Sequence, residues 1–431
     1  MNMLLYDAVV FDLDGTLTDS QEGIISATRY ALEKMNAPIP ENVVLRKFLG
    51  PPLLTSFKTH CGMTDEEAQT ATDYYREYYV PGGWKKNRVY EGIRPLLQQL
   101  KKQGAKLYIA TAKPIGICTT ILEYFGLAQY FDCIAGALNG EKYPTKDVII
   151  GRALQGAAYT KAAMVGDRAS DLRGAQLFGI DSIAAGYGYG SEEELRGAAP
   201  THYVGSTASL AQLLLGEVPQ QSGYFISMEG LDGCGKTTQM DMLEKYLCDM
   251  GYDVRRTREP GGCKISEKIR ELLLDIDNKG MTDICEALLY AASRAQHVRE
   301  VIRPAIENGQ IVLCDRFVDS SVAFQGGARD LGTALIQQIN APALDGCFPN
   351  ATVYLRLDHQ TALARRENAS VLDRIESEKA SFHAQVESAY DQLAQASPDR
   401  FVIVDASRSP ADVSDEIRVK LLNKLIAAGV A

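Results

Sequence analysis

The chain has 431 residues, a formal net charge of −10, 46% hydrophobic and 23% charged residues, and a pI near 5.2. This length exceeds one ordinary hydrophobic core and predicts two or three globular domains. The acidic balance argues against a general surface for nucleic acid or anionic membrane, and we expect neither partner. Nine scattered cysteines without a C-x-x-C pair and an N-terminus without a basic region are typical of a cytoplasmic protein.

Short apolar segments alternate with amphipathic helical segments along most of the chain. We expect strands at 7–11, 106–111, 162–166, 224–230, 311–315, 352–357 and 401–405. Such alternation predicts α/β domains, each with a parallel sheet and helices on both faces. Residues 20–80 interrupt the series, because they carry helical patterns and almost no strand. We interpret them as a helical insertion.

A polar segment divides the chain into two halves. A helix near 206–215 ends at Gly216, and the following residues, EVPQQSG, read as a linker with Pro and Gly before a new apolar strand. We therefore predict a first domain at 1–216, a linker at 217–223 and a second domain at 224–431.

Candidate catalytic carboxylates follow the first expected strand. In FDLDGTLTDS (11–20), Asp12 and Asp14 are two residues apart, so their side chains point to the same side of an extended segment. Other polar side chains end or follow later elements of this domain: Thr111, Lys146, Asp167 and Asp171. Open α/β sheets build their sites at the carboxyl ends of strands, and we expect these groups to converge there.

This order of motifs resembles the haloacid dehalogenase superfamily of phosphatases over about residues 5–215. The stretches RKFLGPPLLTSF (46–57), KKNRVYEGI (85–93) and YIATAKP (108–114) are similar to its phosphoglycolate phosphatase and 5′-nucleotidase-like branch. The resemblance implies a Rossmann-like parallel sheet with a helical cap at about residues 18–88.

The resemblance also implies a mechanism. Asp12 would attack phosphorus and form an aspartyl-phosphate, and Asp14 would protonate the leaving oxygen and then activate water. Mg²⁺ would be held by Asp12, the backbone carbonyl of Asp14, and Asp167, with Asp171 as an outer or alternate carboxylate.

Thr111 and a lysine would hold the phosphoryl group of a phosphomonoester whose identity stays open. Lys146 directly precedes an acidic-Val-Ile sequence, as in the nucleotidase-like branch. Lys142, four residues earlier, is the alternative.

The stretch GLDGCGKTT (230–238) fits the P-loop pattern G-x-x-x-x-G-K-[ST] between an expected strand and a helix. In such loops backbone N–H groups cradle phosphates at a helix N-terminus. Lys236 would contact the β- and γ-phosphates of ATP, and Thr237 would hold Mg²⁺. The candidate nucleotide-binding residues are Gly230, Asp232, Gly233, Cys234, Gly235, Lys236, Thr237 and Thr238.

Five further motifs follow in order: TREPGG (257–262), EKIREL (267–272), LLYAASRAQH (288–297), CDRFVDSSVAFQGGAR (314–329) and LDRIE (372–376). With the P-loop, they resemble bacterial thymidylate kinases over about residues 222–431. The resemblance implies a P-loop nucleoside monophosphate kinase fold, transfer of the ATP γ-phosphoryl group to dTMP giving dTDP, and a homodimer formed through this domain.

The resemblance implies two sets of substrate-binding residues. The set at the sugar and 5′-phosphate of dTMP contains Asp232, Glu259, Arg270 and Arg316, and Asp315 would help organise the metal and phosphate site. The set at the base contains Tyr290, stacked on thymine, with Arg294, Ser321 and Gln325 at the base edge. Taken singly, Tyr290 could instead be a core residue and Arg294 a surface ion pair.

The segment ALARRENASVLDRIE (362–376) departs from the family pattern. Glu367 and Ala369 stand where basic residues are frequent, and the P-loop carries Gly233 instead of an arginine. We hypothesise that Arg366 or Arg374 supplies the catalytic arginine. A weakly active nucleotide sensor is the alternative for this half, and a docking or oligomerisation module is the alternative for the first half.

Overall fold

The computed structural model describes residues 4–138, 141, 144–366, 374–375 and 378–430. It divides into two compact units, one built almost entirely from residues up to Gln220 and the other almost entirely from Gln221 onward. The division falls within the segment 217–223. Among the described residues, no helix is long and apolar enough to cross a membrane.

The first unit is built on a six-stranded parallel sheet with the order β5-β4-β1-β6-β7-β8. The central strand β1 pairs with β4 and β6. Its residue Val9 lies opposite Leu107 of β4 and opposite Ala163 of β6. Its residues are apolar and buried on both faces, as parallel sheets require. The strands are β1 (Ala8–Phe11), β4 (Lys106–Pro114), β5 (Cys133–Ala137), β6 (Ala162–Gly166), β7 (Asp181–Ala185) and β8 (His202–Val204).

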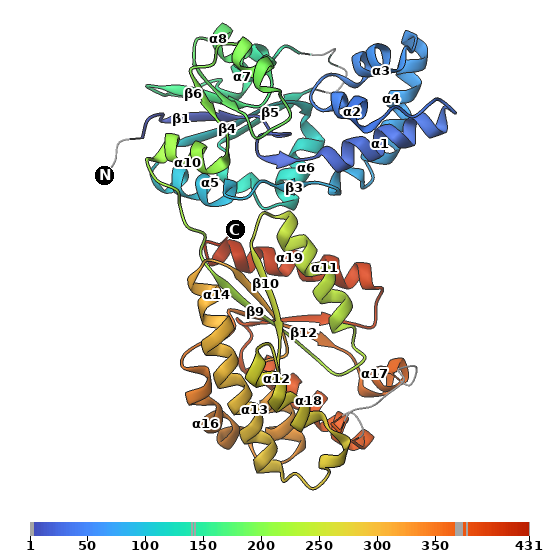
Figure 1. The fold of residues 1–431 in the computed structure, drawn as a ribbon, viewed down its shortest axis with the longest axis vertical. Helices are drawn as coiled ribbons and strands as arrows, with labels where there is room; N and C mark the ends of the chain where they lie inside the picture. The colour runs from blue at the N-terminus through green and yellow to red at the C-terminus, as the bar shows by residue number, and fades with distance from the viewer. Residues whose placement is uncertain (1–3, 139–140, 142–143, 367–373, 376–377, 431) are drawn as a thin grey trace. The chain divides into compact units, whose positions relative to one another are not determined.

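Helices cover both faces of this sheet (Figure 1). One face carries α7 (Lys146–Ala153) and α8 (Ala169–Phe178), and the other carries α5 (Ile93–Lys102) and α10 (Thr207–Leu215). Helix α10 ends at Gly216 as expected, because this residue adopts φ 75°, the left-handed conformation that favours glycine. The remaining helices are α6 (Ile115–Tyr124) and α9 (Glu192–Gly197).

The expected helical insertion is confirmed. It contains α1 (Gln21–Lys34), α2 (Asn42–Leu45), α3 (Leu53–Cys61) and α4 (Asp65–Tyr79). A two-stranded antiparallel pair, β2 (Thr18–Asp19) and β3 (Arg88–Val89), joins it to the sheet domain. Helix α4 begins with a capping box, in which the Thr64 side chain accepts from Glu67 N and the Glu67 side chain accepts from Thr64 N.

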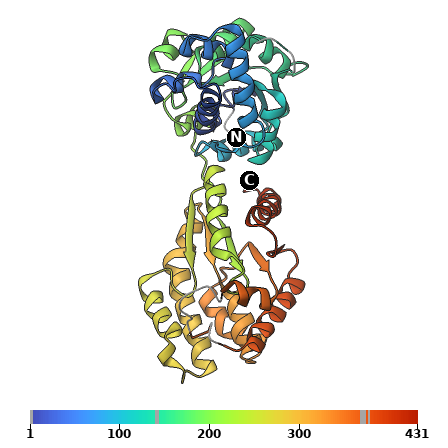
Figure 2. The ribbon, with the colours of Figure 1, turned by 90° about the vertical axis from the view of Figure 1, so that its right-hand side faces the viewer.

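The second unit has a five-stranded parallel sheet with the order β10-β11-β9-β12-β13. Figure 2 shows its helices on both sides of the sheet. The strands are β9 (Tyr224–Glu229), β10 (Val254–Arg258), β11 (Ile311–Asp315), β12 (Ala351–Arg356) and β13 (Phe401–Asp405). The helices that position the site are α11 (Lys236–Asp249), α12 (Lys264–Leu274), α13 (Asp283–His297), α15 (Val318–Ser321), the π-helical turn η6 (Val322–Ala328), α17 (His359–Arg366) and α18 (Ala380–Ala396).

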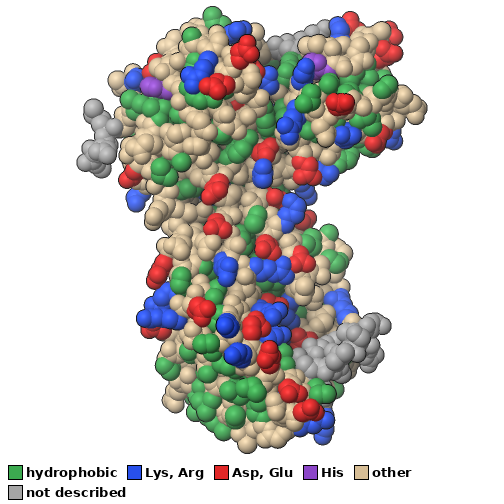
Figure 3. All heavy atoms as spheres, viewed as in Figure 1, with side chains coloured by type: hydrophobic (Ala, Val, Ile, Leu, Met, Phe, Trp, Pro, Cys, Tyr) green, Lys and Arg blue, Asp and Glu red, His purple; other side chains and the backbone are tan. Residues whose placement is uncertain are grey.

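Outer helices complete this unit: α14 (Arg303–Glu307), α16 (Thr333–Leu344) and α19 (Pro410–Ala427). On the face drawn in Figure 3, positively and negatively charged side chains are interspersed over both units. The seven strands expected from the sequence are confirmed, with each end at the expected residue or within three residues of it, and both domains are parallel α/β structures.

Candidate active sites

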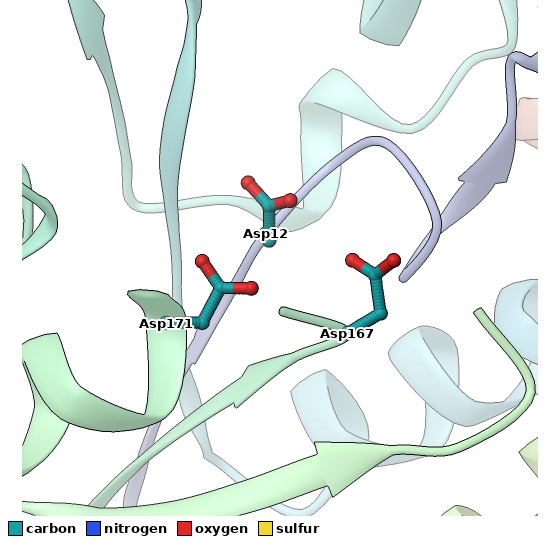
Figure 4. Close-up of side chains that lie close together, drawn as sticks. All are labelled: Asp12, Asp167 and Asp171. Carbon is teal, nitrogen blue, oxygen red and sulfur yellow. The ribbon is translucent and has the colours of Figure 1, made fainter. Parts of the chain in front are cut away.

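Three carboxylates meet at the carboxyl end of the sheet in the first unit (Figure 4). Asp12 follows β1, Asp167 follows β6, and Asp171 lies in the first turn of α8. One oxygen from each lies within 4.8 Å of the other two, and all three side chains are buried. Neighbouring strands β1 and β6 bring these groups together, because their connections leave on opposite sides and open a crevice at the strand ends. Carboxylate oxygens are the ligands that Mg²⁺ prefers, and this set fits such an ion.

Lys146 lies against the same cluster. Its Nζ is 2.8 Å from Oδ1 of Asp12 and 2.7 Å from Oδ1 of Asp171, so one buried ammonium bridges two buried carboxylates. It begins α7, which packs on α8. Lys142, the alternative phosphate lysine, lies outside the described residues.

Burial changes the proton affinity of this cluster. It raises the pKa of Asp12 to about 6, although the charge of Lys146 acts in the opposite direction. Burial, with the charges of Asp171 and Asp12, also raises the pKa of Asp167 well above its usual value. Several negative charges in a dry site are thus unfavourable until cations compensate them.

Asp14 faces a different partner. Its Oδ2 lies 2.9 Å from Nζ of Lys113, a buried lysine on β4. Its Oδ1 is buried and accepts no hydrogen bond from any described residue. Thr111, two residues before Lys113, is buried, and its hydroxyl accepts from the Lys113 N–H at 3.3 Å. The structure therefore brings all six candidate residues of this half to one end of the sheet.

In the second unit, the P-loop joins β9 to α11. Gly233 and Gly235 adopt φ 87° and 95°, conformations that favour glycine. A Cβ atom on Gly233 would lie 2.3 Å from the carbonyl oxygen of Ala362, so this position also requires the absence of a side chain. Nζ of Lys236 donates to the carbonyl oxygens of Gly230 and Leu231 at 3.2 and 3.0 Å, which holds it inside the loop.

A cavity of about 430 Å³ begins at this loop, a size typical of small-molecule sites. Polar and aromatic side chains from several helices and strands line it. The expected residues along its wall are Asp232, Gly233, Gly235, Lys236, Thr237, Thr238, Glu259, Arg270, Tyr290, Arg294, Asp315, Arg316, Ser321 and Gln325. Gly230 and Cys234 belong to the loop backbone, and the Cys234 side chain is buried beneath it.

Arg316 lines this cavity beside the P-loop. Its guanidinium donates to Oδ1 of Asp232 at 2.7 Å and to Oγ of Ser320 at 3.2 Å. The residue has φ 65°, which is uncommon for a side-chain-bearing residue and typical of functional positions. Arg270 lies on α12 and donates to the carbonyl oxygen of Pro260 at 2.8 Å.

A buried glutamate, Glu229, supports Arg316. Glu229 accepts hydrogen bonds from the hydroxyls of Ser320 and Tyr390 at 2.6 and 2.7 Å, and the same hydroxyls contact Arg316. Burial, with the charge of Asp319, raises the pKa of Glu229 to about 7. The sequence reasoning missed this network, although Glu229 ends the strand immediately before the P-loop.

Arg294 lies deeper in the cavity and is held on several sides. Its Nε donates to Oε2 of Glu259 at 2.7 Å, and its terminal nitrogens donate to Ser321 and Asn340. The second oxygen of Glu259 lies 3.0 Å from Nδ1 of the buried His297. Arg294 is therefore a buried, preorganised donor. The surface ion pair considered from the sequence is wrong, because only 1% of Arg294 is exposed.

The two candidate catalytic arginines of segment 362–376 lie in different places. Arg366 ends α17, and its side chain lies outside the described residues. Arg374 is buried, donates from Nε to the carbonyl oxygen of Leu273 at 2.9 Å, and lies 2.7 Å from Glu286. Its neighbour Ile375 lines the cavity.

Comparisons with known proteins match the two halves of the chain to two different families. The thymidylate kinase family model matches residues 228–417. A thymidylate kinase of Geobacillus thermodenitrificans (strain NG80-2) is 48% identical over 206 residues, 47% of this chain and 92% of that protein. A thymidylate kinase of Pelobacter propionicus (strain DSM 2379 / NBRC 103807 / OttBd1) is 47% identical over 206 residues, 46% of this chain and 94% of that protein.

The haloacid dehalogenase-like hydrolase family model matches residues 9–185. Among solved structures, a predicted phosphatase from Clostridium acetobutylicum shares 42% identity, covering 49% of this chain and 99% of its own, with a TM-score of 0.47. The chain therefore belongs to the thymidylate kinase family through its second half and carries a haloacid dehalogenase-like hydrolase domain in its first half.

Proposed function

We propose that the second unit transfers the γ-phosphoryl group of ATP to dTMP, giving dTDP. The observation that carries this proposal is one cavity running from Lys236 of the P-loop to Tyr290 and Gln325. The P-loop offers backbone N–H groups and Lys236 for the phosphates of ATP. The Tyr290 ring and the Gln325 amide offer a stacking face and a hydrogen-bonding edge for a base. Arg270 and Arg316 line the same cavity and would bind the acceptor phosphate there.

Arg270 and Arg316 would act by positioning the phosphates of the two substrates. Two highly charged phosphates repel, and guanidinium groups neutralise and align them. Arg316 is fixed by Asp232 and Ser320, so little side-chain motion is lost when a phosphate binds. Mg²⁺, held through Thr237 and the ATP phosphates, would neutralise charge on the transferring group. Dimerisation stays a prediction.

We further propose that the first unit hydrolyses a phosphomonoester. Asp12 would attack phosphorus and form an aspartyl-phosphate while Asp14 donates a proton from its unpaired Oδ1 to the leaving oxygen. Water activated by Asp14 would then release inorganic phosphate. Lys146 and Thr111 would hold the phosphoryl oxygens. Mg²⁺ held by Asp12, the carbonyl of Asp14, and Asp167 would shield the anionic nucleophile from the anionic phosphate.

The buried charges favour an active phosphatase over a docking module. Lys146, Asp12, Asp167 and Asp171 are all largely shielded from water. Burying several charges costs stability, and a module retained only for docking would be more stable with apolar residues there.

Each site provides the control for the other. With p-nitrophenyl phosphate and Mg²⁺, Asp12→Asn should abolish phosphate release, whereas Lys236→Met should leave it unchanged. With dTMP and ATP, Lys236→Met should abolish dTDP formation, whereas Asp12→Asn should leave it unchanged. An Asp12→Asn protein that still releases phosphate at the wild-type rate would contradict the phosphatase assignment.

The natural substrate of the first unit decides between two roles. A phosphatase that hydrolyses dTMP would oppose the kinase on one metabolite and regulate its pool. A phosphatase that prefers other nucleoside monophosphates or small phosphates would serve a separate clearing role. Initial rates on dTMP, dUMP, other 5′-nucleotides and phosphoglycolate separate these roles.

A further inference from the structure

Glu286 is a buried carboxylate that contacts Gln325, a lining residue of the cavity in the second unit, and it has no role in the mechanism so far. It lies on α13, one helical turn before Tyr290, and only 1% of it is exposed. Its carboxylate contacts side chains from two other segments. Oε1 accepts from Nε2 of Gln325 at 2.8 Å, and Oε2 lies 3.3 Å from Arg329 and 2.7 Å from Arg374.

The contact with Gln325 fixes the direction of the amide. A carboxylate only accepts hydrogen bonds, so the amide must turn its NH₂ group toward Glu286. The guanidinium groups of Arg329 and Arg374 contact the same carboxylate and hold it in place. The carbonyl oxygen of Gln325 then points away from Glu286, and no described residue donates a hydrogen bond to it.

This direction determines which base edge the cavity accepts. Gln325 lines the cavity together with Tyr290 and Arg294. An amide that presents its carbonyl oxygen pairs with a base N–H group. Thymine and uracil carry an N–H at N3, whereas cytosine carries an unprotonated acceptor there. Two acceptors facing each other leave both buried and unpaired, which is costly.

We propose that Glu286 is the positioning residue that sets the base selectivity of the kinase, by holding Gln325 with its amide carbonyl toward the base. The inference rests on the proposed binding of the base beside Gln325.

The test compares kcat/KM for dTMP, dUMP and dCMP in the full-length protein. In Glu286→Gln, the new amide can present its own NH₂ group to the Gln325 oxygen, so Gln325 can turn. The ratio of kcat/KM for dTMP to that for dCMP should then fall about tenfold or more. The value for dUMP should fall in parallel with dTMP, because both bases carry the same N3–H.

Arg329→Gln is the matched control. It removes a partner of Glu286 but leaves the carboxylate facing Gln325, so the dTMP to dCMP ratio should stay at the wild-type value even if the protein becomes less stable. A Glu286→Gln protein that loses activity uniformly on all three substrates, with unchanged ratios, would overturn the proposal.

A second variant covers the case in which Glu286→Gln does not fold. Gln325→Met keeps the side-chain size, removes the amide, and should lose the preference for dTMP and dUMP over dCMP. An unchanged preference in Gln325→Met would also overturn the proposal. Failure of the underlying function has a different signature, namely a wild-type protein that forms no dTDP or does not prefer dTMP to dCMP.

Discussion

Nζ of Lys113 lies 2.9 Å from Oδ2 of Asp14. The same ammonium donates to the Tyr79 hydroxyl at 2.8 Å, so a single buried lysine joins the expected proton donor of the phosphatase to helix α4 of the insertion. Burial opposes the charged form, yet the charge of Asp14 raises the pKa of Lys113 well above its usual value. Lys113 is thus a permanent cation beside Asp14.

Replacing Lys113 should therefore impair phosphate release. In Lys113→Met, Asp14 loses its ionic partner and its fixed orientation, and we expect kcat for p-nitrophenyl phosphate to fall about tenfold or more. Lys106→Met, at the exposed start of the same strand, is the control and should keep the wild-type rate. Equal rates in the Lys113 and Lys106 variants would show that Lys113 does not position Asp14.

Lys146→Met should destabilise the first unit in a manner that depends on magnesium. Removing the ammonium leaves Asp12 and Asp171 buried without their cation, a change that costs about 3–5 kcal/mol in comparable sites. Mg²⁺ would replace part of the lost positive charge, so the drop in melting temperature should be larger in EDTA than in Mg²⁺. The same drop in both conditions would argue against a metal at this cluster.

Phosphatase rates of Lys142→Met and Lys146→Met decide which lysine binds the phosphoryl group. We expect the rate to be lost in Lys146→Met and retained in Lys142→Met, because Lys146 contacts the nucleophile.

Magnesium binding to the first unit should strengthen as pH rises. The pKa of Asp12 is raised to about 6 and that of Asp167 is raised as well, so both acids stay protonated to higher pH than usual. A metal must displace those protons. We therefore expect affinity to increase from pH 5 to pH 7 and binding to be accompanied by proton release. Calorimetry in two buffers of different ionisation enthalpy measures both quantities.

Asp167→Asn is the control for that titration and should bind Mg²⁺ weakly at every pH. An affinity in the wild type that does not change between pH 5 and pH 7 would contradict the assignment of Asp12 and Asp167 as ligands.

The sequence predicted strands with a clear apolar run, including the edge strand β13, but did not predict β5, β7, β8 or β10. Strands such as AVVF (Ala8–Phe11) are buried on both faces and therefore consist of apolar residues. Strand β10 (Val254–Arg258) reads VRRTR, because it lies at the sheet edge where its arginines reach water. Strand β8 (His202–Val204) has only three residues, too few for a recognisable pattern.

The sequence likewise predicted only some of the residues in the candidate sites. Motif residues such as Asp12 and Lys236 were predictable because each lies directly after a strand or at the start of a helix. Glu286 and Lys113 were not singled out, because their roles depend on partners distant in the sequence, Gln325 and Asp14. One local signal was present for Lys113, which follows the predicted site residue Thr111 by two residues.

One assay tests whether this chain carries two separate active sites. Purified protein is given dTMP, ATP and Mg²⁺, and dTDP, ADP, thymidine and inorganic phosphate are followed together in the wild type, Asp12→Asn and Lys236→Met. We predict equal amounts of dTDP and ADP in the wild type and in Asp12→Asn, and neither product in Lys236→Met. Any thymidine and phosphate formed should persist in Lys236→Met and vanish in Asp12→Asn. Continued dTDP formation in Lys236→Met, or its loss in Asp12→Asn, would contradict the account.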